Sequence, residues 1–518
     1  MKSPVTVFIE GLQILAFMLP WLNPFAPGPT PAVVPWLIAV GVTGGLILLE
    51  SLRTAPRQQP GKASFGEGWA FPMACACALA GLISSVMGLM QYFGVSTMLE
   101  PWVAGTAPGE AFANLRQRNQ FASLTNLSLA ALVWLAATDR GAPHRKWLVL
   151  LGAALLAVGN AASSSRTGLL QLFLLCMLCG VWGTWRQPLA RRVLLVAVLI
   201  YALALLALPW LAGFELQGQG ALARLRDGDA GCGSRITLWS NVLHLIAQKP
   251  WLGWGWGELD YAHYMTLYPD KRFCYLLDNA HNLPLHLAVE LGIPIAMLVC
   301  SLTAWLVLRA RPWGESDPTR QLAWSLLALI TLHSLLEYPL WYGPFQMALG
   351  VSVYLLCTPR ERRAPAWGSQ SGVDTKRVRA NYLLAATAAL MMAVAASAAW
   401  EYHRVRQIYL EPAQREAAYR ENTLEKIRDT YLFRHQFDFA AVSLTPLTPA
   451  NALQIYTLSS ELLHYSPEPR VIEKVIESAV MLRRGDDALL HLARYRAAFP
   501  ADHAQWRQTL IMPNRPAN

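Results

Sequence analysis

The feature that most constrains this chain is a series of long apolar runs separated by short polar connections. The first run, VTVFIEGLQILAFMLPWL, begins at Val5, and similar runs recur over the first 400 residues. A helix needs about 20 apolar residues to cross the hydrocarbon core of a bilayer, where every backbone polar group must be satisfied internally. The chain is 54% hydrophobic and only 15% charged, which exceeds ordinary globular usage. The sequence therefore predicts an all-α polytopic membrane protein.

We expect about eleven transmembrane helices. The first run has no small-residue cleavage site, so it is interpreted as a retained span and not as a removed signal peptide. The expected spans lie near residues 5–22, 32–52, 69–93, 119–137, 147–161, 168–184, 193–213, 283–308, 321–338, 342–357 and 381–400.

The positive charge indicates which side of the membrane each connection faces. With a cytoplasmic N-terminus, the inner segments carry 19 Lys and Arg residues, whereas the short outer loops carry only Arg116, Arg118 and Arg166. An excess of Lys and Arg marks cytoplasmic loops. The net charge of +10 is therefore assigned to topology and not to nucleic-acid binding. An odd number of spans places the C-terminal region outside, which is the periplasmic side if the source is a Gram-negative bacterium.

The chain then divides into four parts. Residues 1–213 form an N-terminal transmembrane bundle of about seven spans, and residues 214–282 a large periplasmic loop. Residues 283–400 form a second bundle of about four spans, and residues 401–518 a soluble periplasmic helical domain. This last part has no span-length apolar run but shows helical periodicity, for example in RVIEKVIESAVMLRRG. Its helices resemble tetratricopeptide-type repeats, although only about one unit is legible.

Six of the eight cysteines lie within or at the end of predicted spans, where a thiol behaves as a small apolar group. Cys232 and Cys274 alone share a polar region, the large outer loop. Disulfides form in oxidising compartments, so we expect these two cysteines to close that loop.

Several arginines break the topology rule on the outer side. The fourth span opens with NLRQRNQFA, in which Gln117, Arg118 and Asn119 form a cluster of hydrogen-bond donors suited to anionic or sugar oxygens, or simply to the membrane interface. Arg166 follows in SSSRTG, and Arg235 begins an amphipathic segment in the large loop. A charge at the membrane boundary is costly enough to suggest a function, and guanidinium groups match phosphate. The pattern favours a phosphate-bearing ligand.

His281 stands in DNAHN, where the large loop meets the eighth span. A lone histidine is often structural, but this one lies beside Asp278 and Asn282 at the water–lipid boundary and titrates near working pH, which suits a general base. The segment EYPLWY lies where another predicted span returns to the same outer side. It brings Glu337 and Tyr338 within reach of the site.

Two further His–Glu pairs lie one helical turn apart, where the partners can satisfy each other: His286 with Glu290, and His333 with Glu337. GWGWG at 253–257 is compatible with a sugar-stacking site or with an aromatic belt at the membrane interface.

Other signatures are missing. The sequence contains no paired-acid DxD, HExxH or CxxC…CxxC pattern, so we expect no metal and no cofactor. It also has no Walker-type loop, which disfavours nucleotide hydrolysis.

In this order, RQRNQ, SSSRTG, GSRITLW with KPWLGWGWG, DNAHN with HLAVELGIP, and EYPLWY resemble the bacterial O-antigen ligase superfamily, in its protein O-oligosaccharyltransferase branch that glycosylates pilins. The resemblance covers most of residues 110–345 and extends, through FDFAAVSLTPLTPANA, into the C-terminal region. The family motif at the fourth span has Gln-Pro-Asn where this chain has Gln-Arg-Asn, so Arg118 is an additional charge.

The resemblance implies a bacterial inner-membrane enzyme whose active site faces the periplasm. Such an enzyme transfers a preassembled glycan from undecaprenyl diphosphate to a hydroxyl of a pilin-like periplasmic protein, without a metal. By the same resemblance His281 is the essential loop histidine and Arg166 and Arg235 bind the donor diphosphate. Gln117 and Tyr338 are polar site residues, and we add Arg118, Asn119, Asn282 and Glu337 to the candidate site.

Three alternatives stay open. An O-antigen ligase acting on lipid A core and a glycan polymerase would use the same loop chemistry, and the soluble outer tail favours a protein acceptor over these. A lipid-glycan transporter would need polar residues along a path through the bilayer, whereas the unusual arginines lie on one side.

Overall fold

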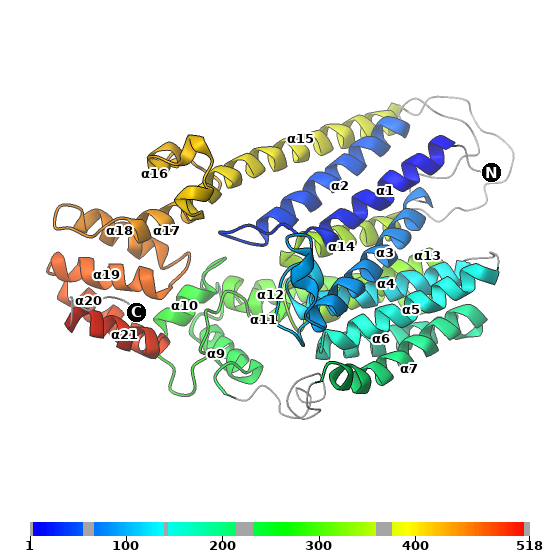
Figure 1. Ribbon diagram of the computed structural model, residues 1–518, viewed down its shortest axis with the longest axis horizontal. Coiled ribbons are helices and arrows are strands. Elements are labelled where there is room, and N and C mark those ends of the chain that lie inside the picture. Colours follow the sequence, from blue (N-terminus) through cyan, green and yellow to red (C-terminus); the bar gives the residue numbers. More distant parts are fainter. Residues whose placement is uncertain (1–3, 55–66, 139–142, 214–230, 359–374, 512–518) are drawn as a thin grey trace. The chain divides into compact units, whose positions relative to one another are not determined.

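The computed structural model describes residues 4–54, 67–138, 143–213, 231–358 and 375–511 (Figure 1). These residues form helices joined by turns, and none of them forms a β-strand. The chain divides into two compact units. One comprises Met1–Gly228 with Val307–Ala399, and the other comprises Asp229–Leu306 with Trp400–Asn518. The all-helical architecture predicted from the sequence is confirmed.

The first unit contains the helices that coincide with most of the predicted spans. They are α1 (Pro4–Leu22), α2 (Val33–Thr54), α3 (Glu67–Tyr92), α4 (Arg118–Thr138), α5 (Pro143–Ala162), α6 (Arg166–Val181), α7 (Pro188–Leu211), α13 (Pro318–Ser334), α14 (Gly343–Cys357) and, up to Ala399, α15 (Thr375–Arg406).

Six helical stretches among the described residues are long and apolar enough to cross a membrane: 33–51, 69–92, 118–138, 188–211, 293–314 and 379–409. Four shorter apolar helices accompany them. The chain is therefore a multi-pass membrane protein, while the expected total of eleven spans stays a prediction.

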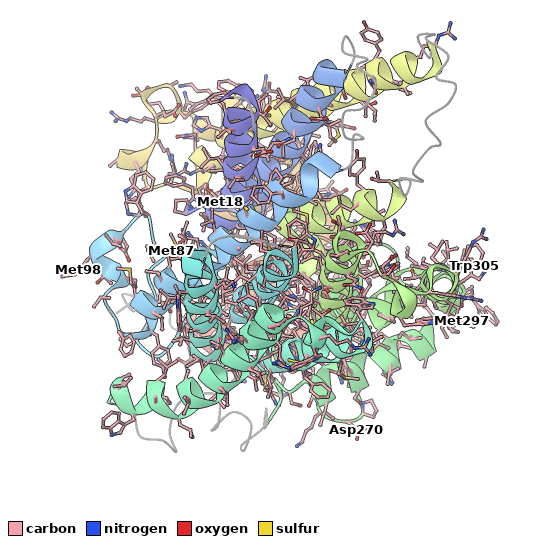
Figure 2. All side chains as sticks on the ribbon, turned by 90° about the vertical axis from the view of Figure 1, so that its right-hand side faces the viewer. Met18, Met87, Met98, Asp270, Met297 and Trp305 are labelled. Carbon is pink, nitrogen blue, oxygen red and sulfur yellow. A yellow bond between two sulfur atoms is a disulfide. The ribbon has the colours of Figure 1, made fainter. Side chains whose placement is uncertain are left out.

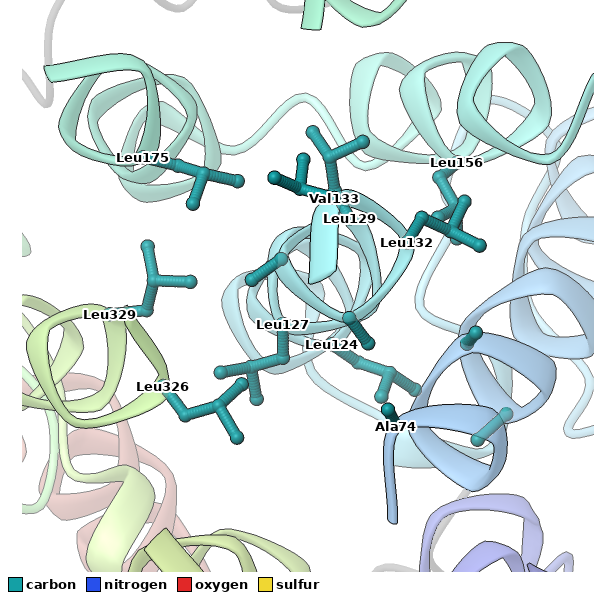
Figure 3. Close-up of a cluster of buried hydrophobic side chains, with 14 of the residues drawn as sticks. Ala74, Leu124, Leu127, Leu129, Leu132, Val133, Leu156, Leu175, Leu326 and Leu329 are labelled. Atoms are coloured by element: carbon teal, nitrogen blue, oxygen red, sulfur yellow. The ribbon is translucent and has the colours of Figure 1, made fainter. Parts of the chain in front are cut away.

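Helix α4 is the central element of the first unit. In an apolar stretch of 18 residues of α4, 83% of the residues are buried, whereas the corresponding share for α2 is 22%. Helix α4 is therefore surrounded by protein and not by lipid. Figure 3 shows its side chains pointing to several neighbours at once. The buried residues drawn there include Ala74 of α3, Leu124, Leu127, Leu132 and Val133 of α4, Leu156 of α5, Leu175 of α6, and Leu326 and Leu329 of α13. This packing fixes the N-terminal end of α4, which begins within NLRQRNQFA.

Buried polar groups also join α4 to its neighbours. The Ser123 hydroxyl lies 2.9 Å from Nδ1 of His333 and donates to Oε1 of Gln171 at 3.0 Å. Side-chain hydrogen bonds between spans replace the water that these groups lose. His333 thus contacts α4 through Ser123, and its expected pairing with Glu337 stays a prediction.

The second unit contains the large loop and the C-terminal helices. Its helices are α9 (Arg235–Gln248), α10 (Leu259–Met265), α11 (Leu283–Leu291), α12 (Ile293–Ala310) up to Leu306, α16 (Thr423–Ile427), α17 (Arg434–Leu444), α18 (Ala452–Leu462), α19 (Pro469–Met481), α20 (Gly485–Ala498) and α21 (Pro500–Ile511). Residues 214–230, the beginning of the predicted loop, lie outside the described residues.

The predicted span at 283–308 is divided at Gly292 into α11 and α12. Gly292 has a φ of +88°, which favours glycine, and a Cβ there would overlap with the carbonyl of Trp251. Beyond the break α12 is almost entirely exposed, and Figure 2 shows Met297 and Trp305 on its outer surface. The continuous apolar run therefore predicted one helix where the structure has two. The break at Gly292 is explained by packing against another segment of the chain.

GWGWG is the segment that packs against this break. Backbone N–H groups of Trp254 and Gly255 donate to the carbonyls of Val289 and Glu290, each at 2.9 Å. The indole N–H of Trp254 donates to the carbonyl of Leu245 at 3.0 Å. The glycines therefore allow close backbone contact, and Trp254 is structural, while Trp256 stays exposed.

The C-terminal helices share one core with the loop helix α10. Helix α19 buries Val471, Ile472, Val475, Ile476 and Ala479, which lie at helical spacing on one face. Tyr264 of α10 belongs to the same cluster, and its hydroxyl lies 3.0 Å from Nδ1 of His491 on α20. The C-terminal helices and the loop thus fold as one unit.

Candidate functional site

Asn119 is the centre of a polar network in the first unit. Its Nδ2 donates to Oε1 of Glu337 at 2.9 Å, and its Oδ1 accepts from the Ser165 hydroxyl at 2.6 Å. Glu337 is buried. Three segments that are far apart in the sequence, at the ends of α4, α6 and α13, therefore meet at one side chain. Asn119 and Glu337, both singled out from sequence, are direct hydrogen-bond partners.

Arg166 is positioned by this network. Ser165 is the N-cap residue of α6, where its hydroxyl accepts from the N–H of Gly168 at 3.0 Å, and Arg166 is the first residue of the helix. Its side chain is exposed. A helix N-terminus carries partial positive charge and attracts anions, so the guanidinium and the helix end reinforce each other.

Gln117 and Arg118 are used within the protein. Oε1 of Gln117 accepts from the N–H of Gln120 at 2.7 Å and so caps the start of α4. Arg118 forms an ion pair with Glu110 at 3.0 Å, and the other carboxylate oxygen of Glu110 accepts from Thr106. The additional charge of Arg118 is therefore matched by an acid of the preceding loop.

Tyr338 is half-buried and directly follows Glu337. Its ring stacks on Tyr342, with 6.0 Å between the ring centroids. Tyr342 is the N-cap residue of α14. The two rings therefore connect the polar network to the beginning of that helix.

His281 lies in a tight turn of the second unit. Its φ of +52° is in the left-handed region, and its N–H donates to Oδ1 of Asn279 at 2.9 Å. Asn282 caps α11, because its Oδ1 accepts from the N–H of Leu285 at 3.1 Å. Left-handed backbone in a residue other than glycine is costly and persists where surrounding contacts fix it. The turn that carries the imidazole is thus fixed by a hydrogen bond on each side, one to Asn279 and one to Asn282.

Arg235 is the first residue of α9, after the N-cap Ser234. One turn later, on the same face, the indole N–H of Trp239 donates to the carbonyl of Ala280 at 3.0 Å. Because Ala280 is bonded to His281, the face of α9 that carries Arg235 lies against the histidine turn. Arg235 and His281, predicted as phosphate ligand and base, thus lie on adjoining segments of one unit.

Two further links hold these segments together. Cys232 and Cys274, the cysteines predicted to pair, form a disulfide with 5.4 Å between their Cα atoms. Asn241 donates to the carbonyl of Lys271 at 3.0 Å and accepts from the N–H of Phe273 at 2.8 Å. These hydrogen bonds attach the segment that precedes DNAHN to α9.

Asp278 interacts electrostatically with its neighbour His281. Partial desolvation raises the pKa of the Asp278 carboxyl, and the imidazole of His281 opposes that rise. The two side chains are therefore close enough to interact electrostatically. Among the described residues, no group of three His, Cys, Asp or Glu side chains is arranged to hold a metal ion.

Three known protein families match the chain in succession. Residues 111–136 match the family described as "Protein glycosylation ligase", residues 151–300 match "O-Antigen ligase", and residues 321–510 match "Virulence factor membrane-bound polymerase, C-terminal". The first two matches contain Asn119, Arg166, Arg235 and His281.

Curated relatives agree with these matches. The general O-oligosaccharyltransferase of Acinetobacter baylyi is 25% identical over 291 residues, 53% of this chain and 48% of that protein. The ComP-specific O-oligosaccharyltransferase of the same organism is 25% identical over 245 residues, 47% of this chain and 43% of that protein. These matches support the O-antigen ligase superfamily, in its protein O-oligosaccharyltransferase branch.

An O-antigen ligase is similar to this chain at a comparable identity. The O-antigen ligase of Pseudomonas aeruginosa is 27% identical over 251 residues, 48% of this chain and 53% of that protein. The chain spans about half the length of the curated relatives that it matches.

Several positioning residues of this chain were not singled out from its sequence. Ser165 belongs to SSSRTG, and Trp239 and Asn241 lie in the amphipathic segment that begins at Arg235. A serine directly before a predicted helix is a capping signal, because its side chain can accept from the backbone N–H three residues later. This signal could have identified Ser165. The long-range partners of Asn119, Trp239 and Asn241 left no local signal.

Proposed function

We propose that this protein is an O-linked oligosaccharyltransferase of the bacterial inner membrane. It transfers a preassembled glycan from undecaprenyl diphosphate to a Ser or Thr hydroxyl of a pilin-like protein, at a site that faces the periplasm. The observation that carries the proposal is the contact of α9 with the histidine turn, which puts a guanidinium and an imidazole on adjoining segments. Two relatives of the chain are O-oligosaccharyltransferases, which supports the same reaction.

In the proposed reaction the acceptor hydroxyl oxygen forms a bond to the anomeric carbon of the glycan. The bond between that carbon and the diphosphate oxygen breaks, and undecaprenyl diphosphate leaves with the electron pair. His281 accepts the hydroxyl proton, a contribution of about 10² to 10⁴ in rate. Arg235 and Arg166 stabilise the charge on the departing diphosphate, because fixed positive groups favour charge that develops in the transition state.

Asn119, Ser165 and Glu337 act as positioning residues in this proposal. Their hydrogen bonds fix the N-terminus of α6, and with it the backbone of Arg166. Asn282 does the same for His281 by capping α11. A long arginine side chain carries considerable rotational freedom, so anchoring its backbone reduces the cost of ordering it on a phosphate.

We further propose that residues 401–518 form a periplasmic helical domain that docks the acceptor protein. Its helices α17 to α21 form a folded body with its own core, and α10 connects this body to the loop that carries His281. A folded acceptor needs such a surface, whereas a lipid acceptor reaches the site from the membrane.

The test is transfer in cells that make a lipid-linked glycan and a candidate pilin. Wild-type protein should increase the mass of the pilin by one glycan, and His281→Ala should abolish that increase at unchanged protein level. His244→Ala, a histidine substitution on α9, is the matched control and should retain transfer. Full transfer by the His281→Ala variant would refute the role of the histidine.

A second candidate function is ligation of the glycan to lipid A core. It is favoured by the similarity to the O-antigen ligase of Pseudomonas aeruginosa, whose 27% identity is comparable to the 25% of the two O-oligosaccharyltransferases. The same cells discriminate the two functions, since glycan that appears only on lipopolysaccharide and never on the pilin identifies the lipid acceptor.

A further inference from the structure

Helix α6 is attached to its neighbours through one side of its first two turns. Ser165, Gly168 and Gln171 lie at intervals of three residues and therefore share that side. The Ser165 hydroxyl donates to Asn119 of α4 at 2.6 Å. Nε2 of Gln171 donates to the carbonyl of Leu329 of α13 at 2.9 Å. Gly168, between these two attachments, has further polar contacts that the proposed function does not use.

Two buried asparagines converge on the carbonyl oxygen of Gly168. Nδ2 of Asn126, on α4, donates to it at 3.0 Å, and Nδ2 of Asn160, on α5, makes a longer contact of 3.5 Å. The two asparagines are only 1% and 3% exposed. The N–H of the same glycine donates to the Ser165 hydroxyl at 3.0 Å. The N–H and the carbonyl of Gly168 are thus both bound by buried side chains.

This contact requires a glycine. A Cβ at residue 168 would overlap with Oδ1 of Asn160 and would lie 2.7 Å from Cβ of Ala122 on α4. Carbon atoms that pack favourably are about 3.5 to 4.0 Å apart, so neither neighbour leaves room for a side chain. Small residues allow close approach of membrane helices. The first turn of α6 is therefore in close contact with both α4 and α5.

Stability alone does not explain the two asparagines. Side-chain amides can hold membrane helices together, but buried polar atoms normally have partners. Among the described residues, Oδ1 of Asn126 and Oδ1 of Asn160 accept no hydrogen bond. A buried acceptor without a donor costs free energy, whereas leucine, with the same branching and the same number of non-hydrogen atoms, would avoid that cost. The donors of both amides converge two residues after Arg166.

Arg166 lies on the side of α6 opposite to these attachments. Arg166, Leu170 and Phe173 follow one another at intervals of four and three residues, and all three are exposed. The attached side therefore fixes the backbone of the first turn, while the guanidinium remains accessible to a ligand.

We propose that Asn126 and Asn160 are positioning residues for Arg166. Together with Gly168 they form the α6 anchor, which fixes the point from which the guanidinium meets the donor diphosphate. The inference rests on the proposed function for the role of Arg166. Bidentate pairing of guanidinium with phosphate depends on geometry, so a displaced helix end should weaken donor binding and leave acceptor binding unchanged.

The test is a double-mutant cycle between Asn126→Leu and Arg166→Gln. Asn126→Leu should raise the KM for the lipid-linked donor about fivefold, which corresponds to one hydrogen bond. It should leave the KM for the acceptor protein unchanged and should not lower Tm, because it also removes an unsatisfied oxygen. In the Arg166→Gln background it should have no further effect. Thr138→Val, which also replaces a polar side chain of α4, is the matched control and should behave as the wild type.

A second pair of variants tests the same contact from α6. Gly168→Ala should raise the donor KM about tenfold or more, because the added Cβ displaces the first turn of the helix. Gly180→Ala lies on the same helix, and its Cβ would meet Trp185 at an ordinary 3.6 Å. This control should behave as the wild type.

The outcomes separate the α6 anchor from the proposed function. An unchanged donor KM in Asn126→Leu, or an undiminished effect of Asn126→Leu in the Arg166→Gln background, would overturn the anchor. An unchanged donor KM in Arg166→Gln alone would refute the role of Arg166 on which the inference rests. Absence of any glycan transfer by the wild type would refute the proposed function. Binding of undecaprenyl diphosphate to the four proteins of the cycle would then still test the anchor, since the same pattern is expected in Kd.

Discussion

Asp260 should make the second unit less stable as the pH rises, and Asp260→Asn should remove that effect. The residue lies on α10, is 9% exposed, and accepts a hydrogen bond from the N–H of Tyr261 at 2.7 Å. Burial raises the pKa of its carboxyl from 3.8 to about 8, and the negative charges of Asp278 and Glu258 add to the rise. Burying a charge without a partner costs free energy, so the folded unit prefers the protonated acid.

The direction follows from proton linkage. Because the folded pKa is above the unfolded one, the folded state binds more protons, and its advantage is complete below pH 3.8 and is lost as the pH rises to about 8. His263 opposes this at low pH, since burial lowers its pKa to about 3, and its effect ends near 6.5. Between pH 6.5 and 8 the contribution of Asp260 alone is about 2 kcal/mol, at 1.36 kcal/mol per pH unit.

The measurement is thermal unfolding of the purified protein at pH 6.5 and 8. For a unit of this size about 2 kcal/mol corresponds to a shift in Tm of about 4 to 8 °C. The wild type should lose that much more stability over this interval than Asp260→Asn. Asp270→Asn, an exposed acid in the same loop, should behave as the wild type. Equal pH dependence of the wild type and Asp260→Asn would show that Asp260 is ionised in the fold at neutral pH and refute the reasoning.

Three further predictions concern the packing of the same unit. Gly253→Ala should cost about 3 kcal/mol or more, because a Cβ at this left-handed residue overlaps with the carbonyl of Glu290; Gly257→Ala, also left-handed but with open space, should cost only about 1 kcal/mol by the same thermal assay. Cys274→Ser opens a loop with a sequence separation of 42 and should lower stability by about 4 kcal/mol, whereas reductant should affect only the wild type. Tyr264→Phe removes one buried hydrogen bond between α10 and α20 and should cost about 1 kcal/mol; no change in unfolding would mean that the bond is replaced by water.

The fold could be predicted from sequence because its main signal is local. A run of apolar residues long enough to cross a bilayer has few alternatives to a helix, and each expected span coincides with helical structure. Gly292 is the exception, since a glycine in such a run does not by itself mark a break. The break arises because the loop near Trp251 packs against it, and that contact lies far away in the sequence.

The candidate site was predictable only as a set of residue types. His281, Arg166 and Arg235 stood out because a charge or a titratable group at a membrane boundary is costly and so suggests a function. The residues that position these three side chains could not be identified from the sequence. Ser165 and Trp239 hold the site through hydrogen bonds to Asn119 and to the carbonyl of Ala280, and neither bond follows from local spacing.

The sequence alone determined that this chain is a helical multi-pass membrane protein with arginines between its apolar runs and a histidine at a loop-to-helix junction. These properties depend on hydrophobicity and charge, which each segment carries by itself. Tertiary structure alone decided that Asn119 joins Ser165 to Glu337, that α9 lies against the turn of His281, and that two buried asparagines bind the carbonyl of Gly168. Such features depend on which side chains meet after folding, and distance along the chain does not encode them.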